Sequence, residues 1–383
     1  MKTALLGEVA SFVNGGTPAR SVPEFYEGSI PWITGADVAS DQTISARSHI
    51  TEEAVARSAA QILAPGSLAL VTRTSVGKVG LVVEPTAISQ DITGVIPATD
   101  IATRFLMHVL RWNGPGLARR ARGATIKGVT RAEVASISVP VLTLDEQRRI
   151  AAILDQADAI RAKRRQVLAH LDTLARSTFV AMFGGLDATA TVADVASNIR
   201  TGPFGSQLLH SEFVDEGVAV LGLDNVVGNQ FVWGQRRYIT PEKYEKLRRY
   251  TVTPGDVLIS IMGTTGRCVV VPDGIPTAIN TKHICAITPT PGLIDPSFLR
   301  AAFLWHPKSR AHLLRQTKGS IMDGLNMGII KAMPVPVPPI ELQREFAAKV
   351  EAVDAQRAVV ERALDADDEL FASLQTRALR GEQ

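Results

Sequence analysis

The residues with the clearest chemical potential in this sequence lie in loops that are rich in Gly, Thr, Ser and Arg. One such loop spans residues 14–20, a second spans 73–78 and a third spans 89–91. Glycine lets a backbone approach a phosphate, hydroxyl and amide groups bond base edges, and Arg or Lys neutralises phosphate or reads guanine. Each loop taken alone is better interpreted as an ordinary turn with solvated charges.

The same loops recur in the second half of the chain with changed residues. Residues 200–206 mirror the first loop, 262–267 the second and 280–283 the third. A basic cluster that includes Arg119, Arg120, Arg122 and Lys127 also has a counterpart, which ends at Lys318. Two domains with the same fold but different loop residues are what the recognition of two different base sequences requires. The candidate DNA-binding residues are Gly15, Thr17, Arg20, Arg73, Thr74, Ser75, Lys78, Gln90, Arg119, Arg120, Arg122 and Lys127 in the first half, and Arg200, Thr201, Ser206, Thr264, Thr265, Arg267, Asn280, Lys282, His283 and Lys318 in the second.

The recurrence of the loops belongs to an internal repeat that covers about half of the 383 residues. The offset, which is the difference in residue number between matched positions of the two copies, is constant near the end of each copy. It becomes smaller upstream, as expected when loops differ in length. A period near 190 residues is too long for a solenoid and indicates two copies of one domain with its appendage. The matched segments are 123–154 with 319–350 at an offset of 196, 65–66 with 254–255 at 189, and Gly35 and Asp37 with Gly222 and Asp224 at 187.

Each copy begins with a domain of mixed structure, residues 1–144 and residues 184–340. Short apolar runs bounded by Gly, Pro, Asp or Ser predict strands, and a longer run late in each domain predicts a helix. Many short strands with few helices favour an α+β fold over a doubly wound parallel sheet. The predicted strands are 68–71, 79–83, 257–261 and 269–271, and the predicted helices are 105–112 and 298–305.

Each copy ends in a predicted long helix, residues 145–183 and residues 341–379 within the C-terminal segment 341–383. Neither helix contains Gly or Pro, and Thr143 with Glu146 forms a capping box at the first start. Apolar residues spaced by threes and fours predict the seam of a coiled coil. Two separate amphipathic helices, each lying on its own domain, are the alternative. The predicted seam residues are Ile150, Leu154, Ala157, Ile160, Val167, Leu171 and Leu174 in the first helix, and Phe346, Val350, Val353, Val360, Leu364, Leu370 and Leu374 in the second.

The path of the chain favours an antiparallel pairing of these two helices. If the second helix runs back toward the first domain, the termini meet and a pseudo-two-fold axis relates the copies. A parallel pairing would require the linker after Gly184 to retrace the whole helix, and that linker is too short. The first helix carries seven basic and five acidic residues, whereas the segment 341–383 carries six basic and ten acidic residues, which suits their pairing.

The sequence contains no catalytic signature. The phosphate-binding pattern G-x-x-x-x-G-K-[ST] fails because Thr72 stands where its first glycine belongs.

The two cysteines, Cys268 and Cys285, form no C-x-x-C pair, so neither a zinc site nor a disulfide scaffold is expected, and unpaired cysteines fit a reducing cytoplasm. No run approaches the 18 apolar residues of a membrane span. The net charge of only +3 argues against a basic tail. It is still compatible with basic patches on parts of the surface.

Short motifs then match a known family. Val139-Pro140-Val141 is followed by Glu146-Gln147, the second copy has Pro336-Val337-Pro338-Pro339 followed by Gln343, and the tail reads Ala378-Leu379-Arg380-Gly381-Glu382. In these motifs, in their spacing and in its duplication, the sequence resembles the specificity subunit of type I restriction-modification enzymes over nearly its whole length. Glu341-Leu342 departs from the pattern, because the first copy has Asp145-Glu146 there.

The resemblance implies a DNA-recognition subunit without catalysis of its own, located in the cytoplasm. Each target-recognition domain would bind one half of a bipartite double-stranded DNA target, and the paired helices would set the gap between the halves. The helices would dock two modification (methyltransferase) subunits that bind S-adenosylmethionine. The complex would recruit restriction subunits that use ATP and Mg²⁺, so no cofactor is expected on this chain. The alternative is an adaptor whose duplicated domains bind protein or RNA.

Overall fold

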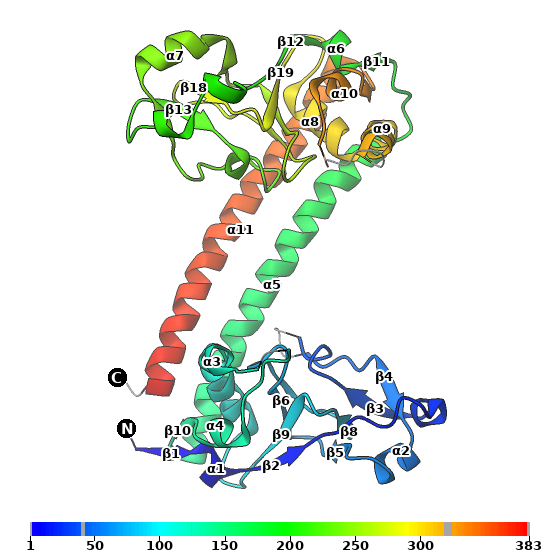
Figure 1. Ribbon diagram of the computed structural model, residues 1–383, viewed down its shortest axis with the longest axis vertical. Helices are drawn as coiled ribbons and strands as arrows, with labels where there is room; N and C mark the ends of the chain where they lie inside the picture. The colour runs from blue at the N-terminus through cyan, green and yellow to red at the C-terminus, as the bar shows by residue number, and fades with distance from the viewer. Residues whose placement is uncertain (1, 40–42, 124, 318–323, 381–383) are drawn as a thin grey trace. The chain divides into compact units, whose positions relative to one another are not determined.

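The computed structural model describes residues 2–39, 43–123, 125–317 and 324–380, and these form two compact units (Figure 1). The first unit contains Met1–Arg165 and Arg362–Gln383, and the second contains Gln166–Glu361. Each unit therefore combines one globular part with a stretch of each long helix. The boundaries predicted after residues 144, 183 and 340 instead separate each globular domain from the long helix that follows it.

The globular part of the first unit is built on two four-stranded sheets. One sheet has the order β2 (Ala10–Asn14), β9 (Ile92–Pro97), β6 (Leu68–Val71) and β7 (Val79–Leu81), and all its pairs are antiparallel. The other has the order β4 (Ser48–Ile50), β3 (Ile30–Ile33), β8 (Thr86–Ile88) and β5 (Gln61–Leu63), in which β3 and β8 run parallel. The predicted strands at 68–71 and 79–83 are thereby confirmed.

The central strand β6 is apolar on both faces because both of its faces are covered. Leu68 and Leu70 point into a core shared with α3 (Thr103–Arg120), whereas Ala69 and Val71 point into the core between the two sheets. This is the two-residue alternation of a strand buried on both sides. The remaining helices of this part are short, namely α1 (Leu6–Val9), α2 (Glu52–Ala56) and α4 (Arg131–Ala135).

The second unit repeats this topology strand for strand. Its first sheet has the order β12 (Ala196–Thr201), β19 (Ile284–Pro289), β16 (Val257–Ser260) and β17 (Cys268–Val270). Its second has the order β14 (Tyr238–Ile239), β13 (Val218–Leu221), β18 (Ala278–Asn280) and β15 (Thr251–Val252), again with one parallel pair, β13 and β18. The internal repeat and the α+β expectation are both confirmed.

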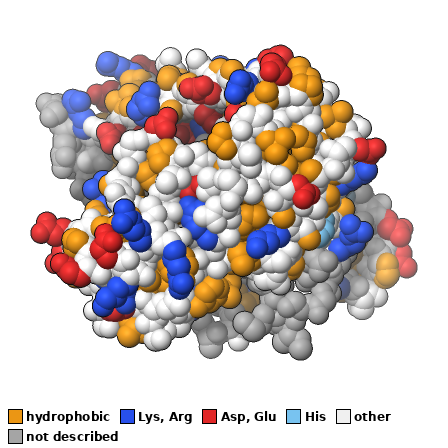
Figure 2. All heavy atoms as spheres, turned by 90° about the horizontal axis from the view of Figure 1, so that it is seen from above, with side chains coloured by type: hydrophobic (Ala, Val, Ile, Leu, Met, Phe, Trp, Pro, Cys, Tyr) orange, Lys and Arg blue, Asp and Glu red, His pale blue; other side chains and the backbone are white. Residues whose placement is uncertain are grey.

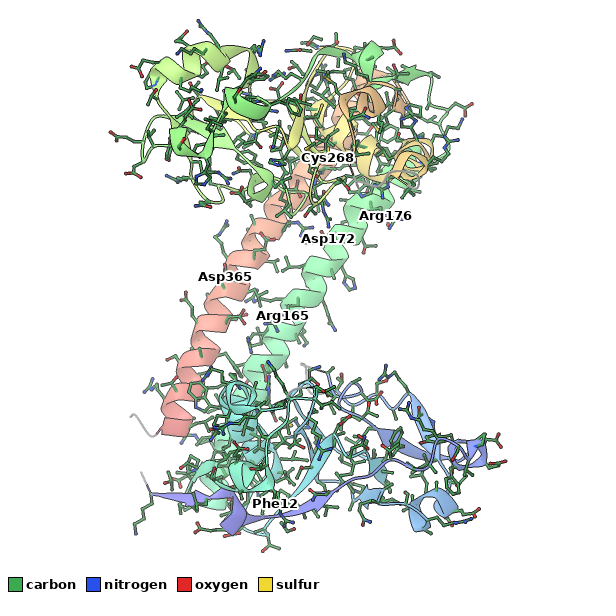
Figure 3. All side chains as sticks on the ribbon, in the orientation of Figure 1. Phe12, Arg165, Asp172, Arg176, Cys268 and Asp365 are labelled. Atoms are coloured by element: carbon green, nitrogen blue, oxygen red, sulfur yellow. The ribbon has the colours of Figure 1, made fainter. Side chains whose placement is uncertain are left out.

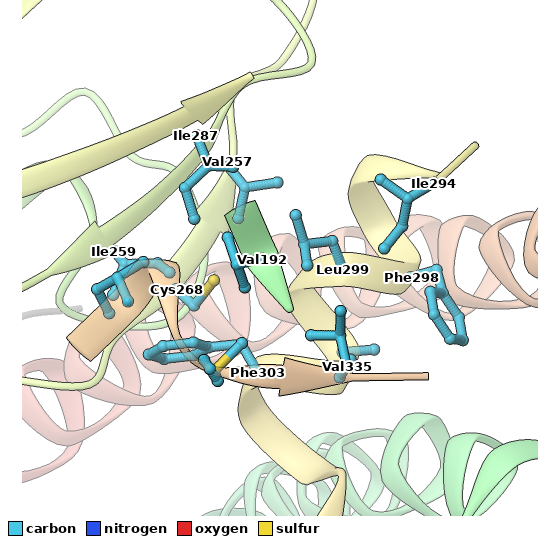
Figure 4. Close-up of a cluster of buried hydrophobic side chains, with 14 of the residues drawn as sticks. Val192, Val257, Ile259, Cys268, Ile287, Ile294, Phe298, Leu299, Phe303 and Val335 are labelled. Atoms are coloured by element: carbon cyan, nitrogen blue, oxygen red, sulfur yellow. The ribbon is translucent and has the colours of Figure 1, made fainter. Parts of the chain in front are cut away.

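The core of the second unit lies between its first sheet and the helix α8 (Pro296–Trp305), as Figure 4 shows. Val257 and Ile259 of β16 and Ile287 of β19 face Phe298 and Phe303 of this helix. The predicted helix at 298–305 is thus confirmed. The other helices are α6 (Val192–Val195), α7 (Pro241–Leu247), α9 (Pro307–Thr317) and α10 (Met327–Lys331).

A two-stranded ladder closes each globular part at its two chain ends. In the first unit, β1 (Thr3–Leu5) pairs with β10 (Ser138–Pro140), so the start of the domain lies beside its last strand. In the second, β11 (Ala190–Thr191) pairs with β20 (Pro334–Val335) in the same way. The Val-Pro motif of the first copy therefore lies in the last strand of its domain, and the motif that starts at Pro336 follows directly after the last strand of the second domain.

The two long helices are α5 (Leu144–Phe183) and α11 (Ile340–Arg380), within one residue of their predicted bounds. The capping box at the start of α5 is formed, because Glu146 Oε2 accepts from Thr143 N at 2.9 Å and Thr143 Oγ1 accepts from Glu146 N at 3.3 Å. The breaker-free sequence thus forms uninterrupted helices of roughly 60 Å at about 1.5 Å per residue. No helix in the described residues is long and apolar enough to cross a membrane.

Within each unit the two helices pack antiparallel. In the first unit the early part of α5 meets the late part of α11, where Arg161 Nε donates to Asp368 Oδ1 at 2.5 Å and Arg164 pairs with Asp367. In the second unit the late part of α5 meets the early part of α11, where Arg357 donates to Asp172, labelled in Figure 3. The antiparallel pairing is confirmed.

The packed stripe of α5 differs from the predicted seam. Leu154, Ala175, Phe179 and Phe183 are buried on α5, and Phe346 and Val350 are buried on α11. The seam between the helices also contains ion pairs, which a purely apolar heptad pattern leaves out. As a correction, four predicted seam side chains lie outside this stripe and are exposed: Ile160 (42%), Val167 (42%), Leu174 (50%) and Leu370 (56%).

Candidate nucleic-acid interface

In the first domain, all three candidate loops meet at the ends of the sheet strands. Loop 14–20 contacts loop 89–91, because Gly16 N donates to Ile88 O at 3.0 Å and Thr17 Oγ1 bonds to Gln90 Oε1. Loop 73–78 joins loop 89–91 because Arg73 N donates to Asp91 O at 3.3 Å, and Ser75 Oγ donates to Gly35 O at 3.2 Å in the turn after β3. Residues from three distant parts of the sequence therefore form one surface.

The predicted basic cluster of the first domain is attached to the same surface. Thr74 N donates to Lys127 O at 3.0 Å, and Arg73 forms a β-bridge with Gly128. Arg122 and Gly128 exchange two further backbone bonds of 2.9 and 3.0 Å. The side chains of Arg73, Arg122 and Lys127 are all exposed, so the structure brings these cations into one basic region.

Gly77 fixes the position of the second loop. It has φ +94°, a left-handed conformation that favours glycine, and a Cβ at this position would lie 2.5 Å from the carbonyl oxygen of Gly114 in α3. The loop therefore packs backbone to backbone on the helix, and no larger residue fits there.

The loops of the second domain converge in the same manner. Thr281 N donates to Leu221 O at 3.0 Å, as Ser89 N donates to Ile33 O at 2.9 Å in the first domain. Lys282, Thr264, Arg267 and Ser206 are exposed, whereas His283 and Thr265 are half-buried. Figure 2 shows Lys and Arg side chains interspersed with neutral and acidic ones on the face that it presents.

Two predicted DNA-binding residues of the second domain are held inside the fold, which corrects the prediction. Arg200 is only 10% exposed and forms an ion pair with the fully buried Asp256, and it also donates to Thr251 O at 2.6 and 3.0 Å. Asn280 is fully buried and donates to Ile284 O at 2.7 Å. Their polar groups stabilise strand ends. Lys318 lies outside the described residues.

Strand register also corrects the match at residues 35–37. Trp32 lies opposite Ala87 in β8, and Val220 lies opposite Ile279 in β18. The two copies are therefore aligned at an offset of 188 here, one more than the glycine match indicates. Consequently Asn225, and not Asp224, occupies the place of Asp37. Both cap the same turn: Asp37 Oδ2 accepts from Thr34 N and Asn225 Oδ1 from Gly222 N, both at 2.8 Å.

Sequence reasoning missed three residues at this turn, Arg236, Arg237 and Asp224. By the ladder between β13 and β14, Arg236 and Arg237 occupy the places of Arg47 and Ser48. The dipeptide Arg236-Arg237 directly before the matched pair Tyr238-Ile239 is the signal that would have revealed both arginines.

Charge states at the interface follow from burial and partners. Burial and the neighbouring Lys282 lower the pKa of His283, which favours the neutral form of its ring. Burial acts to raise the pKa of Asp37, but hydrogen bonds from Arg47 and Thr34 outweigh it, and the pKa is lowered. Burial raises the pKa of Cys268 and Cys285 to about 12, which makes both thiols unreactive. No cluster of metal-ligating side chains occurs in the described ranges.

Thr74 carries backbone strain in the second loop. Its φ is +65°, a left-handed value that is unfavourable for a β-branched residue, whereas its counterpart Gly263 adopts +73° without strain. We expect Thr74→Gly to raise the free energy of unfolding of the first unit by about 1 kcal/mol. Urea unfolding measures this change. Ser75→Gly is the matched control and should destabilise the unit, because Ser75 has no left-handed φ. If both variants lose stability equally, the strain at Thr74 is absent.

Comparison with known proteins gives one family for most of the chain. The sequence model of the type I restriction modification DNA specificity domain matches residues 1–170 and 225–365. The specificity subunit of the type I restriction enzyme EcoR124I/EcoR124II of Escherichia coli is 35% identical over 162 residues, 40% of this chain and 40% of that relative. The EcoBI specificity subunit of Escherichia coli is 23% identical over 332 residues, 78% of this chain and 70% of that relative. The first match thus spans less than half of the relative's length.

Solved structures share the fold. The S subunit of a type I restriction-modification system from M. genitalium has a TM-score of 0.63 at 14% identity and covers 99% of this chain and 96% of its own. A chain from a study of complex assembly and conformational transition of the type I R-M system has a TM-score of 0.56 at 18% identity and covers 100% and 98%. At these identities the likeness shows the architecture alone.

Proposed function

The chain belongs to the type I restriction-modification DNA specificity family, and from this membership we propose that it reads a bipartite DNA target, one half with each domain. The observation that carries the proposal is the convergence of the same three loops in both domains on one strand framework. The framework is repeated strand for strand, while the side chains in the loops differ. Two domains of this kind recognise two different short sequences.

The residues proposed to contact DNA are the exposed and half-buried members of the predicted set. In the first domain these include Arg20, Arg73 and Lys78, and in the second they include Arg267 and Lys282. Exposed cations contact phosphates, and the hydroxyl and amide groups beside them reach base edges. Arg200 and Asn280 position the strands that carry these loops.

The partners and cofactors are also part of the proposal. Methyltransferase subunits that bind S-adenosylmethionine, and restriction subunits that use ATP and Mg²⁺, would assemble on this chain. The exposed apolar residues of α5 in the first unit, Ile153 and Ile160, would offer these subunits a docking surface. The paired helices would set the spacing between the two half-sites. An adaptor that binds RNA or protein is the other candidate, and steep salt dependence of binding to duplex DNA would argue against it.

Matched substitutions in the two domains test the assignment of one half-site to each. Lys78 and Arg267 occupy the same place at an offset of 189. We expect Lys78→Ala to weaken or relax recognition of one half-site only, and Arg267→Ala to affect only the other. A lost base contact costs about 1–3 kcal/mol, whereas a lost phosphate contact weakens binding uniformly and lowers the salt slope by about one. The measurement is the methylated motif, recovered by sequencing DNA from cells that carry the complete complex.

The control for this experiment is Arg148→Ala, which removes an exposed charge from the first turns of α5 without touching a loop. It should leave both half-sites unchanged. An equal loss of preference at both half-sites in either loop variant would contradict the assignment. A wild-type complex that modifies no bipartite sequence would contradict the proposed function itself.

A further inference from the structure

The second domain contains a pocket of about 570 Å³ where its loops converge. Segment 203–215, the turn after β13, residues 235–237 and residues 281–283 form its wall. Two exposed cations in that wall, Arg236 and Lys282, make no ion pair with any described residue. The wall carries three basic residues and two acidic ones, Asp215 and Asp224, which leaves one positive charge in excess, and a nucleic-acid backbone attracts such a charge.

The same wall carries an ion pair with unused hydrogen-bonding capacity. Arg237 Nη2 donates to Asp224 Oδ1, and the two side chains are 27% and 35% exposed. Asp224 Oδ2, Arg237 Nε and the adjacent Thr281 Oγ1 have no hydrogen-bond partner in the described structure. Unpaired polar atoms in shielded positions are rare in proteins, and each requires an explanation. These three atoms are shielded from direct contact with a ligand, but the exposed parts of Asp224 and Arg237 line the pocket, where a ligand with donors and acceptors side by side reaches them.

The fold itself does not require this ion pair. The turn after β13 is capped by Asn225, whose Oδ1 accepts from Gly222 N and whose Nδ2 donates to Val232 O, both at 2.8 Å. Asp37 caps the matching turn of the first domain. In the aligned ladders, the first domain has Ala36 where Asp224 stands and Ser48 where Arg237 stands. The first domain closes its turn with a different ion pair, Asp37 with Arg47, so the turn does not need charged residues at the places of Asp224 and Arg237.

Two glycines leave the space that the Asp224–Arg237 ion pair occupies. A Cβ at Gly222 would lie 2.5 Å from Arg237 Nη2, and a Cβ at Gly234 would lie 2.3 Å from Asp224 Oδ2. Both side chains are therefore confined against backbone, which limits their freedom before any ligand binds. Preorganised donors and acceptors of this kind lose little entropy on binding and discriminate strongly.

We propose that Asp224 and Arg237 are specificity-determining residues that read one G·C base pair in the half-site of the second domain. The carboxylate accepts from the N4 amino group of cytosine, and the guanidinium donates to O6 or N7 of guanine on the opposite strand. These are the contacts that the two side chains prefer in the major groove. An A·T pair fits less well, because it replaces one guanine acceptor by an amino donor and adds the thymine methyl. This inference rests on the proposed function, since it assumes that the second domain binds duplex DNA.

The experiment compares the modified motifs of wild type and variants in the complete complex with its methylation partner. The variants are Asp224→Ala, Asp224→Asn and Arg237→Ala, and the DNA is a library randomised in both half-sites. We expect each variant to relax the preference for G·C at one and the same position by roughly 10- to 100-fold. The other positions of that half-site, and the whole first half-site, should keep their preference. Asp224→Asn keeps the size of the side chain and guards against a loss of packing.

Lys282→Ala is the matched control in the same pocket, because it removes an exposed cation without touching the pair. It should weaken binding and lower its salt dependence while leaving the motif unchanged. The inference is overturned if the Asp224 variants keep the wild-type motif, or if the relaxed position is an A·T pair. Failure of the proposed function looks different, because then the wild-type complex shows no sequence preference at all.

Discussion

Asp256→Ala is expected to lower the free energy of unfolding of the second unit by about 3–5 kcal/mol, the usual cost of removing one partner of a buried ion pair. Asp256 is fully buried, its Oδ2 accepts from Arg200 and from Thr253 N at 2.8 Å, and its Oδ1 accepts from Thr288 Oγ1 at 2.6 Å. The substitution leaves the Arg200 guanidinium, 10% exposed, without its counter-charge. Urea unfolding followed by hydrogen exchange with mass spectrometry measures the loss and assigns it to the unit.

The matched control is Ser67→Ala, because Ser67 occupies the place of Asp256 in the first domain and is 3% exposed without an ion pair. It should cost less than about 1 kcal/mol, since the substitution removes a single hydroxyl group and leaves no buried charge without a partner. A loss below 1 kcal/mol for Asp256→Ala as well would show that Arg200 finds water or another partner, and that the pair does not hold the strands.

Phe179→Ala is the second substitution with a large expected effect, again about 3–5 kcal/mol. Phe179 of α5 is fully buried, and its ring centroid lies 5.5 Å from that of Phe346 in α11 and 5.8 Å from that of Phe298 in α8. One ring thereby joins three helices of the second unit. The cavity left by its removal cannot be filled, because its neighbours are themselves fixed by other aromatic contacts.

Hydrogen exchange is the measurement for this variant as well. We expect lost protection in the last turns of α5 and the first turns of α11, with little change in the first unit. Leu174→Ala on the same helix is the control, because Leu174 is 50% exposed and its truncation should cost less than about 0.5 kcal/mol. Equal effects of the two substitutions would contradict the packed stripe described for α5.

Much of this architecture was accessible from the sequence because its signals are local or repeated. The buried strands β6 and β16 read as short apolar runs, the capping box at Thr143 marks the start of α5, and the absence of Gly and Pro gives the length of both long helices. The repeat added the equivalence of the two domains. Each of these features depends on neighbours in the chain or on comparison of the copies.

The misplaced residues are those whose position depends on distant partners. Arg200 reads as an exposed loop cation until the strand ladder brings it to Asp256, 56 residues away. On α5, apolar residues recur every seven positions at Ile153, Ile160, Val167 and Leu174, and all four are exposed. The side of α5 with the regular seven-residue apolar repeat is therefore not the side that packs. The packed line includes Arg161 and Arg164, whose acidic partners lie on α11, and no pattern within one helix reveals such pairs.

The two-stranded ladders at the chain ends have a consequence for the history of such proteins. Because β1 pairs with β10 and β11 pairs with β20, each domain enters and leaves its framework at one small ladder of two or three residue pairs. A gene segment that encodes β1 through β10, or β11 through β20, would carry one whole domain and neither long helix. Under the proposed function, recombination at the two strands of one ladder would exchange the recognition loops of that domain in a single event, whereas point mutation would have to alter the loops one residue at a time.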